Sequence, residues 1–201
     1  MRKTTVAALV SFAGILGLLA PAAYAGTKFA LDGSHTSVTF AVRHMVVSTV
    51  RGSFGNVSGE IYYDETNPAA SWVKVEIDVN SINTNNERRD GHLKSADFFD
   101  AAKYPKITFE STAVEKQGDR WIARGNLTIK GVTKPIEIPF RLNGPIKDPW
   151  GNLRLGVDAE PIKINRQDFG VTWNQVLDTG GLAVGDEVTI QISAEATAKA
   201  E

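Results

Sequence analysis

The stretch WVKVEIDV, residues 72–79, alternates apolar and polar side chains one by one. Val73, Val75 and Ile77 fall on one side of this stretch, whereas a charged residue such as Lys74 falls on the other. Successive side chains of a β-strand point to opposite faces of the sheet. The pattern therefore predicts a strand with one buried and one wet face, which is typical of antiparallel sheets.

The same alternation runs through most of the chain. It recurs over residues 37–43, 136–142, 153–160 and 188–194, and further strands are expected near residues 28–31, 50–63, 106–116 and 120–129. Short polar stretches at residues 65–68, 116–119 and 130–133 predict tight turns between these strands. Eight or nine strands joined by short turns indicate an antiparallel meander, closed as a barrel or packed as a sandwich.

This register predicts which side chains point into the molecule. The inward set is Val38, Phe40, Val73, Val75, Ile77, Phe109, Ile138, Phe140, Leu155, Val157, Ile190 and Ile192. The outward set is Lys74, Glu76, Glu137, Arg141, Arg154 and Gln191. Small residues also fall on the inward register, at Gly52, Ala123, Gly125 and Ala159. They are expected to leave volume for a ligand, although a filled core is equally consistent with the pattern.

Residues 84–94 break the alternation and predict a short helix from residue 85 to residue 94. Thr84 and Glu87 match a capping box, with Thr84 as the N-cap. Asp90 and Lys94 are spaced to pair on one face of this helix. Such an insertion between strands is expected to lie across one end of a barrel.

The residues around this helix suggest what that end does. Phe98 and Phe99 would plug the end or cover part of its mouth. Arg88, Arg89 or His92 would bind the polar head of a ligand there, since arginine donors bond phenol, amide or phosphate oxygens well. The alternative interpretation is a solvated helix face with its own ion pairs.

The composition limits the classes of function. The chain has 201 residues, which fits one domain with a sizeable core. Its 22 basic and 23 acidic side chains give a net charge of −1, and no basic block is present, so nucleic acid is not an expected partner. The absence of cysteine excludes thiol catalysis and thiolate metal sites.

Motifs for catalysis and metal binding are weak. His35 and His44 flank one predicted strand, and nine residues at about 3.3 Å each place them about 30 Å apart. A metal site would need His92 to meet one of them together with carboxylates. Ser71 and Lys74 match S-x-x-K, but side chains three apart on a strand face opposite sides. No catalytic residue, metal or cofactor is therefore predicted.

The N-terminus has the features of a secretory signal. Arg2 and Lys3 precede an apolar run over residues 6–20, and small residues follow at Ala23 and Ala25. The run is too short to span a bilayer comfortably, so an uncleaved anchor is the less favoured alternative. The predicted organisation is a signal peptide over residues 1–25 and one barrel domain over residues 26–201, and the chain is expected to be exported.

Several longer motifs together resemble one family. They are DGSHTSVTF at 32–40, RDGHLKSADFFD at 89–100, YPKITF at 104–109, GNLTIKGVTKP at 125–135, DFG at 168–170 and VGDEV at 184–188. In order and composition they resemble the YceI-like family of periplasmic, lipocalin-like polyisoprenoid-binding proteins. The resemblance implies an all-β, eight-stranded antiparallel barrel with one short helical insertion and a deep apolar pocket. It also implies secretion to the periplasm, homodimers and roles in stress responses.

The expected function is to bind or carry an elongated apolar ligand: a polyisoprenoid, an isoprenoid quinone or a fatty-chain amide. The predicted pocket residues are Val38, Phe40, Val42, Phe54, Val75, Ile77, Phe109, Ala123, Gly125, Ile138, Phe140, Leu155, Val157 and Ile190. A transient contact with a membrane is an expected part of loading. The alternatives are an enzyme that acts on a lipid or quinone at the barrel mouth, and a structural stress protein with a filled core.

Overall fold

A computed structural model describes residues 26–178 and 180–200, which are organised around one antiparallel sheet. Its strands are β1 (Thr27–His44), β2 (Ser48–Phe54), β3 (Val57–Tyr63), β4 (Trp72–Asp78), β5 (Ile82–Asn83), β6 (Lys106–Gln117), β7 (Arg120–Ile129), β8 (Val132–Lys147), β9 (Asn152–Ala159), β10 (Ile162–Asn165) and β11 (Val184–Lys199). The helix α1 spans Glu87–Lys94, and the 3-10 turns η1, η2 and η3 span Pro68–Ala70, Val79–Ser81 and Arg166–Phe169.

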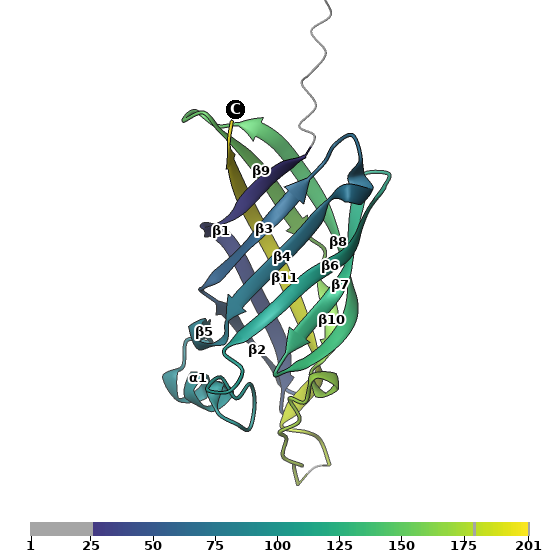
Figure 1. Cartoon of the computed structure of the whole chain (residues 1–201). Helices are drawn as coiled ribbons and strands as arrows, with labels where there is room; N and C mark the ends of the chain where they lie inside the picture. The colour runs from purple at the N-terminus through teal and green to yellow at the C-terminus, as the bar shows by residue number, and fades with distance from the viewer. Residues whose placement is uncertain (1–25, 179, 201) are drawn as a thin grey trace, which may run out of the picture.

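The sheet closes on itself because β1 pairs with β11 (Figure 1). β2 and β3 pair with successive parts of β1, and β9 and β10 pair with successive parts of β11, so each couple forms one interrupted long strand. The wall is thus an up-and-down barrel of eight strands. The predicted barrel is confirmed, and the sandwich is excluded.

The predicted register holds around this wall. Outward-facing Lys74 and Glu76 form ion pairs with Glu110 and Lys106 of the neighbouring strand β6, on the outer face. The opposite faces of the same strands carry the predicted apolar set, which lies inside the barrel. The alternation of apolar and polar residues fixes this arrangement. A shift of the strand pairing by one residue would turn every apolar side chain of that strand outward.

One end of the barrel is a solid core. Phe29 of β1, Leu155 of β9 and Ala196 of β11 have no exposed surface, and Leu153 beside them is almost fully buried. These three strands are adjacent in the sheet, with Leu155 opposite Ala196. This filled end lies at the top of Figure 1, near the C-terminus.

The helical insertion lies at the opposite, lower end (Figure 1), and its start differs from the prediction. The N-cap is Asn86, whose side chain accepts a hydrogen bond from the backbone N–H of Arg89. Thr84 is not the cap because its N–H and hydroxyl both donate to the Asp90 carboxylate. Asp90 is therefore bound to Thr84, and the predicted pair with Lys94 is wrong.

Among the described residues, no helix combines the length and apolarity needed to cross a bilayer. The predicted signal peptide, residues 1–25, lies outside the described part of the chain.

Candidate functional site

A cavity of about 260 Å³ lies within the barrel, bounded by inward-facing side chains of nearly every long strand. The predicted residues that line it are Val38, Phe40, Val42, Phe54, Val75, Ile77, Phe109, Ala123, Ile138, Phe140, Val157 and Ile190. The set comes from all around the wall, so closure of the barrel is what brings it together. Two predicted residues, Gly125 and Leu155, do not line the cavity.

Leu155 faces inward but belongs to the solid end of the barrel, where it is fully buried against Phe29 and Ala196. Gly125 is covered instead by the ring of Phe109: an ideal Cβ on Gly125 would lie 2.7 Å from Phe109 Cζ. The expected gap at Gly125 is therefore filled by an aromatic ring on the neighbouring strand.

Gly52 is covered in the same way. A Cβ there would lie 2.8 Å from Phe40 Cε1 and 2.8 Å from the Thr84 methyl carbon. Of the four small inward residues, only Ala123 and Ala159 border the cavity. The volume expected at the two glycines is thus occupied by the rings of Phe40 and Phe109, whereas Ala123 and Ala159 border the cavity as expected.

The lower end of the cavity is bordered by the segment that follows α1. Phe98 and Phe99 line the cavity there, as predicted, and Phe99 contacts Phe54 edge to face at 6.1 Å between ring centroids. Phe98 packs on Trp173 with ring centroids 5.2 Å apart, and His92 lies 5.0 Å from each of the two rings. These three residues form an aromatic cluster that joins α1 to the segment preceding β11.

Arg166 also borders the cavity, although sequence reasoning did not single it out. Its guanidinium is buried and donates to the carbonyls of Val171, Trp173, Val184 and Gly185 and to the Asp186 carboxylate. Burial lowers the pKa of Arg166, while the charge of Asp186 opposes this shift. All five guanidinium N–H groups are committed, so Arg166 secures the segment before β11 and has no donor left for a ligand.

The predicted head-binding residues do not border the cavity. Arg89 donates from Nε to the Thr84 hydroxyl and from a terminal nitrogen to the Thr84 carbonyl, both at 2.7 Å. His92 Nε2 lies 2.9 Å from the Asp97 carboxylate, and Arg88 is exposed. The helix turns its polar face to solvent, and only Leu93 of α1 reaches the cavity. The alternative of a solvated face with its own polar bonds describes α1 better.

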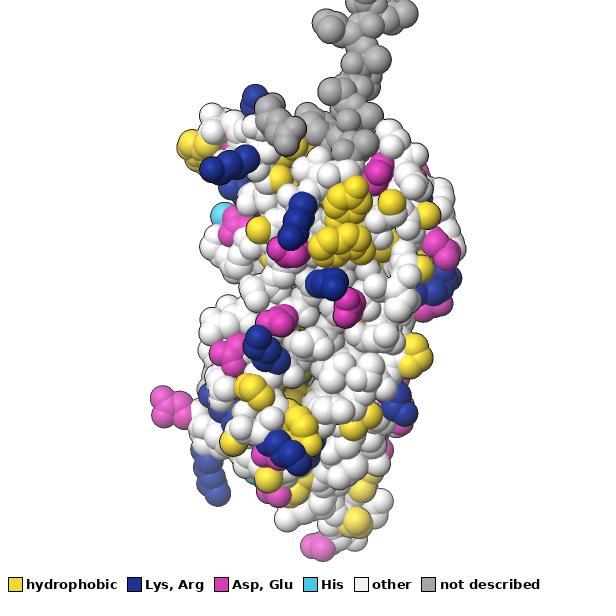
Figure 2. Space-filling view, in the orientation of Figure 1, with side chains coloured by type: hydrophobic (Ala, Val, Ile, Leu, Met, Phe, Trp, Pro, Cys, Tyr) yellow, Lys and Arg dark blue, Asp and Glu magenta, His cyan; other side chains and the backbone are white. Residues whose placement is uncertain are grey.

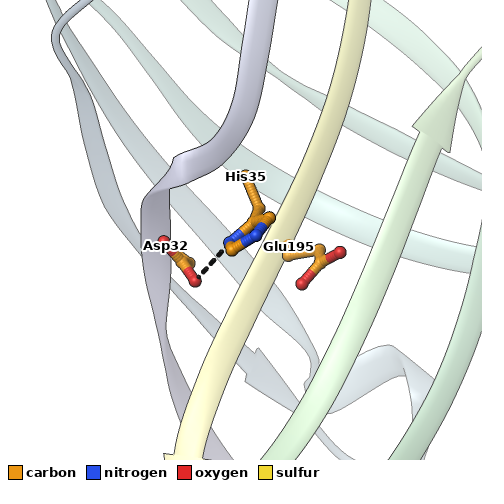
Figure 3. A group of neighbouring side chains, drawn as sticks. All are labelled: Asp32, His35 and Glu195. Atoms are coloured by element: carbon orange, nitrogen blue, oxygen red, sulfur yellow. Dashed lines mark hydrogen bonds and ion pairs between the residues drawn. The ribbon is translucent and has the colours of Figure 1, made fainter.

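A second group of polar side chains lies on the outside of the barrel (Figure 3). Asp32, His35 and Glu195 place their ligand atoms within 4.8 Å of one another, where β1 and β11 lose register. Hydrogen bonds from Ser34 and His35 hold the pKa of the Asp32 carboxyl well below its usual value. His35 lies within β1, not at a strand end as predicted.

The guanidinium of Arg154 forms ion pairs with both carboxylates of this group. It lies 3.3 Å from the Asp32 carboxylate and 2.9 Å from that of Glu195, and its Nε lies 3.0 Å from buried Asp148. A cation would have to enter against this charge. The group therefore ties β1, β9 and β11 together as an ion-pair network.

Comparisons with known proteins agree with this architecture. The model of the YceI-like domain matches residues 29–196. Protein YceI of Salmonella agona is 43% identical over 162 residues, covering 81% of this chain and 84% of that protein. The structure of Burkholderia cenocepacia BcnA matches with a TM-score of 0.72 at 25% identity, covering 82% of this chain and 98% of that chain.

A polyisoprenoid binding domain from Saccharophagus degradans matches with a TM-score of 0.65, covering 85% of this chain and 98% of that chain. Its identity to this chain is 18%, so this likeness concerns the fold alone.

Proposed function

We propose, from the premise that this chain belongs to the YceI-like family, that its barrel binds and carries one elongated apolar molecule. The observation that carries the proposal is the partial exposure of the inward side chains. Val75, Ile77 and Ile138 face the barrel interior yet remain only half-buried. Side chains of a filled core would be close-packed on all sides, so their free surface marks volume that a ligand can take.

The chemistry of the lining indicates an apolar chain. Polar residues on the lining include Thr36, Thr39 and Ser71 among many aliphatic and aromatic side chains. Each methylene moved from water into such a cavity contributes about 0.8 kcal/mol, so ten methylenes contribute roughly 8 kcal/mol, from which the cost of association is subtracted. A polyisoprenoid, an isoprenoid quinone and a fatty-chain amide all meet this requirement.

The same lining favours binding over catalysis. The Ser71 hydroxyl accepts a hydrogen bond from the Asp64 N–H, while Lys74 lies outside the barrel in an ion pair with Glu110. The donors of Arg166 are committed to carbonyls and Asp186. General acid–base catalysis needs a titratable group within reach of the substrate, and none of these groups is free for that role.

The test is to fill the cavity from the wall. Ile138→Trp places an indole inside the barrel, and Glu137→Trp on the same strand places one outside. An empty cavity accepts added volume that a packed core cannot. We expect Ile138→Trp to keep a cooperative unfolding transition but to lose binding of an extended fluorescent fatty acid. Glu137→Trp should bind this probe like the wild type.

Native mass spectrometry of protein isolated from its own host provides a second measurement. A co-purifying apolar mass in the wild type, diminished in Ile138→Trp, is the expected result. The proposal is wrong if the wild type binds no probe and carries no such mass, or if Ile138→Trp binds the probe unchanged.

A further inference from the structure

An exposed apolar surface lies at the end of the barrel that is not filled. It consists of Met45, Val46 and Val47 in the turn between β1 and β2, and of Val176 and Leu182 in the segment between η3 and β11. We name these five residues the apolar tip. Val47 is 81% exposed, Val176 77% and Val46 64%. The segment between η3 and β11 forms the lowest part of the molecule in Figures 1 and 2.

The two parts of the apolar tip are held against each other. The N–H of Met45 donates to the carbonyl of Ala183 at 2.8 Å. An isolated β-bridge joins Val176 to Leu182, so the second part folds back on itself as a narrow hairpin. A Cβ on Gly181 would lie 3.2 Å from a methyl carbon of Val46, so the two loops are in close contact. The tip is thus one joined surface.

The segment that carries the tip also borders the cavity. Val171 lines the cavity wall, and Trp173 packs on Phe98 in the aromatic cluster. Val176 follows three residues after Trp173. Displacement of this segment would therefore part the aromatic cluster and uncover the lower end of the cavity. At the opposite end, Phe29, Leu155 and Ala196 have no exposed surface.

We propose that the apolar tip inserts into the surface of a phospholipid bilayer and that the barrel exchanges its ligand there. This inference rests on the proposed function and adds to it the partner and the end of the barrel used. A long apolar molecule leaves a bilayer at high cost if it must cross water. A mouth whose rim is itself apolar removes that water layer.

The shape and size of the tip favour a bilayer over a protein partner. The tip consists of five side chains on two narrow turns, whereas a stable protein interface buries about 800 Å² and about 20–30 residues on each partner. A convex tip of this size suits the soft boundary between headgroups and acyl chains, where amphipathic surfaces insert about 5–10 Å.

The charges near the tip fit this position. The guanidinium of Arg43 is exposed and bonds the Val46 carbonyl and the Thr49 hydroxyl, directly behind the tip. A cation in that place lies at the level of lipid phosphates when the valines are inserted. Exposed Asp178 lies in the same segment as Val176. Arg43 and Asp178 carry opposite charges beside the tip, so we expect apolar insertion to dominate the affinity.

The opposite end of the barrel provides a matched control. Ile146 and Trp150 are also exposed there, at 62% and 78%. They lie beside the solid core, and the Trp150 ring packs on the guanidinium of Arg154 at 6.0 Å. The double variants Val47→Asp/Val176→Asp and Ile146→Asp/Trp150→Asp therefore make the same change at the two ends.

The experiment uses protein recovered from the periplasm of an expressing bacterium, so that all variants share one N-terminus. Flotation is measured with vesicles of phosphatidylethanolamine and phosphatidylglycerol, and with vesicles of phosphatidylcholine. We expect wild type and Ile146→Asp/Trp150→Asp to float with both. The fraction bound should fall about tenfold or more in Val47→Asp/Val176→Asp, because two apolar side chains lose their burial. Binding should persist in 1 M NaCl, where the Debye length is about 3 Å.

Insertion itself is read from a probe at the tip. The chain has no cysteine, so Val47→Cys and Ile146→Cys each accept a single environment-sensitive fluorophore. Vesicles should shift the emission at position 47 to the blue and leave that at position 146 unchanged. Equal shifts at both ends, absence of flotation by the wild type, or self-association that the Val47→Asp/Val176→Asp change abolishes would overturn the proposal.

Ligand transfer separates this inference from the proposed function. The fatty-acid probe is offered either in solution or already embedded in vesicles. The tip variant should bind the dissolved probe like the wild type but extract it from vesicles at least tenfold more slowly. Equal extraction rates would refute docking and leave carriage intact. Failure of every variant to bind the dissolved probe would refute carriage, while flotation would still report on the tip.

Discussion

Position 125 of β7 has no room for a Cβ atom, because the ring of Phe109 in β6 lies across Gly125. The ring atoms Cζ and Cε2 would stand 2.7 and 2.8 Å from a Cβ at this position, and the Glu110 carbonyl would also clash. Contacts this short force the backbone or the ring to move. The ring in turn borders the cavity, so this glycine positions one of its walls.

We expect Gly125→Ala to lower the free energy of unfolding by about 1–3 kcal/mol, the usual cost of overpacking a core. Urea titration measures the change. Gly91→Ala is the control, because a Cβ on this glycine of α1 meets no atom within 4 Å. Alanine there should stabilise the chain by about 0.5–1 kcal/mol. A Gly125→Ala variant as stable as the wild type would show that Phe109 is free to move away.

Asp32 is a single residue that makes a pH-dependent contribution to the stability of the folded state. Hydrogen bonds from Ser34 and His35 lower its folded-state pKa below the usual value near 3.9. The folded state therefore binds this proton less readily than the unfolded state does. The resulting stability is present above about pH 4 and is lost as the pH falls toward the lower folded-state pKa.

Thermal unfolding between about pH 2 and pH 6 tests this. We expect the midpoint of the wild type to fall more steeply below pH 4 than that of Asp32→Asn, which lacks the titrating group. Asp178→Asn, in an exposed loop, is the control and should keep the wild-type slope. Identical slopes for wild type and Asp32→Asn would contradict the assignment.

At the scale of elements, the segment between η3 and β11 depends on one buried side chain. Arg166 bonds four carbonyls and one carboxylate, and these acceptors lie in the first part of the segment and at the start of β11. This arginine holds the irregular backbone beside the cavity, because that backbone has few strand partners of its own. A planar fork of five donors suits this role, and lysine would not replace it.

We expect Arg166→Met to destabilise the protein by about 3–5 kcal/mol, because several buried acceptors lose their donors. Hydrogen exchange should rise in residues 171–178 and at Met45, whose N–H bonds the Ala183 carbonyl. Arg141→Met, on the outer wall, should stay within about 0.5 kcal/mol of the wild type. An increase in hydrogen exchange limited to residues 165–167 would show that other contacts hold the segment.

The elements also show what the sequence could and could not predict. Period-two alternation is local, so the strands and the hairpin turn between β6 and β7 were predictable from neighbouring residues. The cap of α1 was not, because Thr84 competes for a partner six residues away at Asp90. The position of α1 at one end of the barrel was predictable, but the side chain that it turns to the cavity, Leu93, was not.

The volume of the cavity could not be predicted from single strands, because it depends on contacts between strands. Gly125 and Gly52 look like gaps along the chain, but Phe109 and Phe40 on neighbouring strands cover them. Only the register between strands reveals this. Arg166 was missed because its acceptors are backbone carbonyls, which leave no signature in the side-chain sequence.

At the scale of the molecule, the barrel has two unlike ends. One is packed solid around Phe29, and the other combines a cavity, an aromatic cluster and an exposed apolar tip. Under the proposed function, a ligand enters at the second end, beside the apolar tip. This polarity places the proposed site of exchange away from the start of β1, which lies at the solid end (Figure 1).

The start of β1 constrains where an exported form can begin. Thr27 already pairs with Tyr63, and Phe29 two residues later is fully buried in the solid end. Cleavage after residue 29 or later would remove the Phe29 side chain. The free energy of unfolding would then fall by about 3–5 kcal/mol, the usual cost of losing a core phenylalanine. Cleavage between Ala25 and Gly26 satisfies the small-residue rule and leaves the whole of β1.

We therefore expect periplasmic protein to have Gly26 as its first residue, as measured by intact mass and N-terminal sequencing. Replacing the small residue at the cleavage site, Ala25→Arg, should block processing and leave the longer form attached to the membrane fraction. Ala22→Arg, outside the two recognised positions, is the control and should be processed. Retention of Met1 in the soluble periplasmic form, or processing of Ala25→Arg at the same bond, would contradict this site. A shifted cut that still preserves Phe29 would show that the fold tolerates a different first residue, whereas a soluble form lacking Phe29 would show that the solid end of the barrel does not depend on the start of β1.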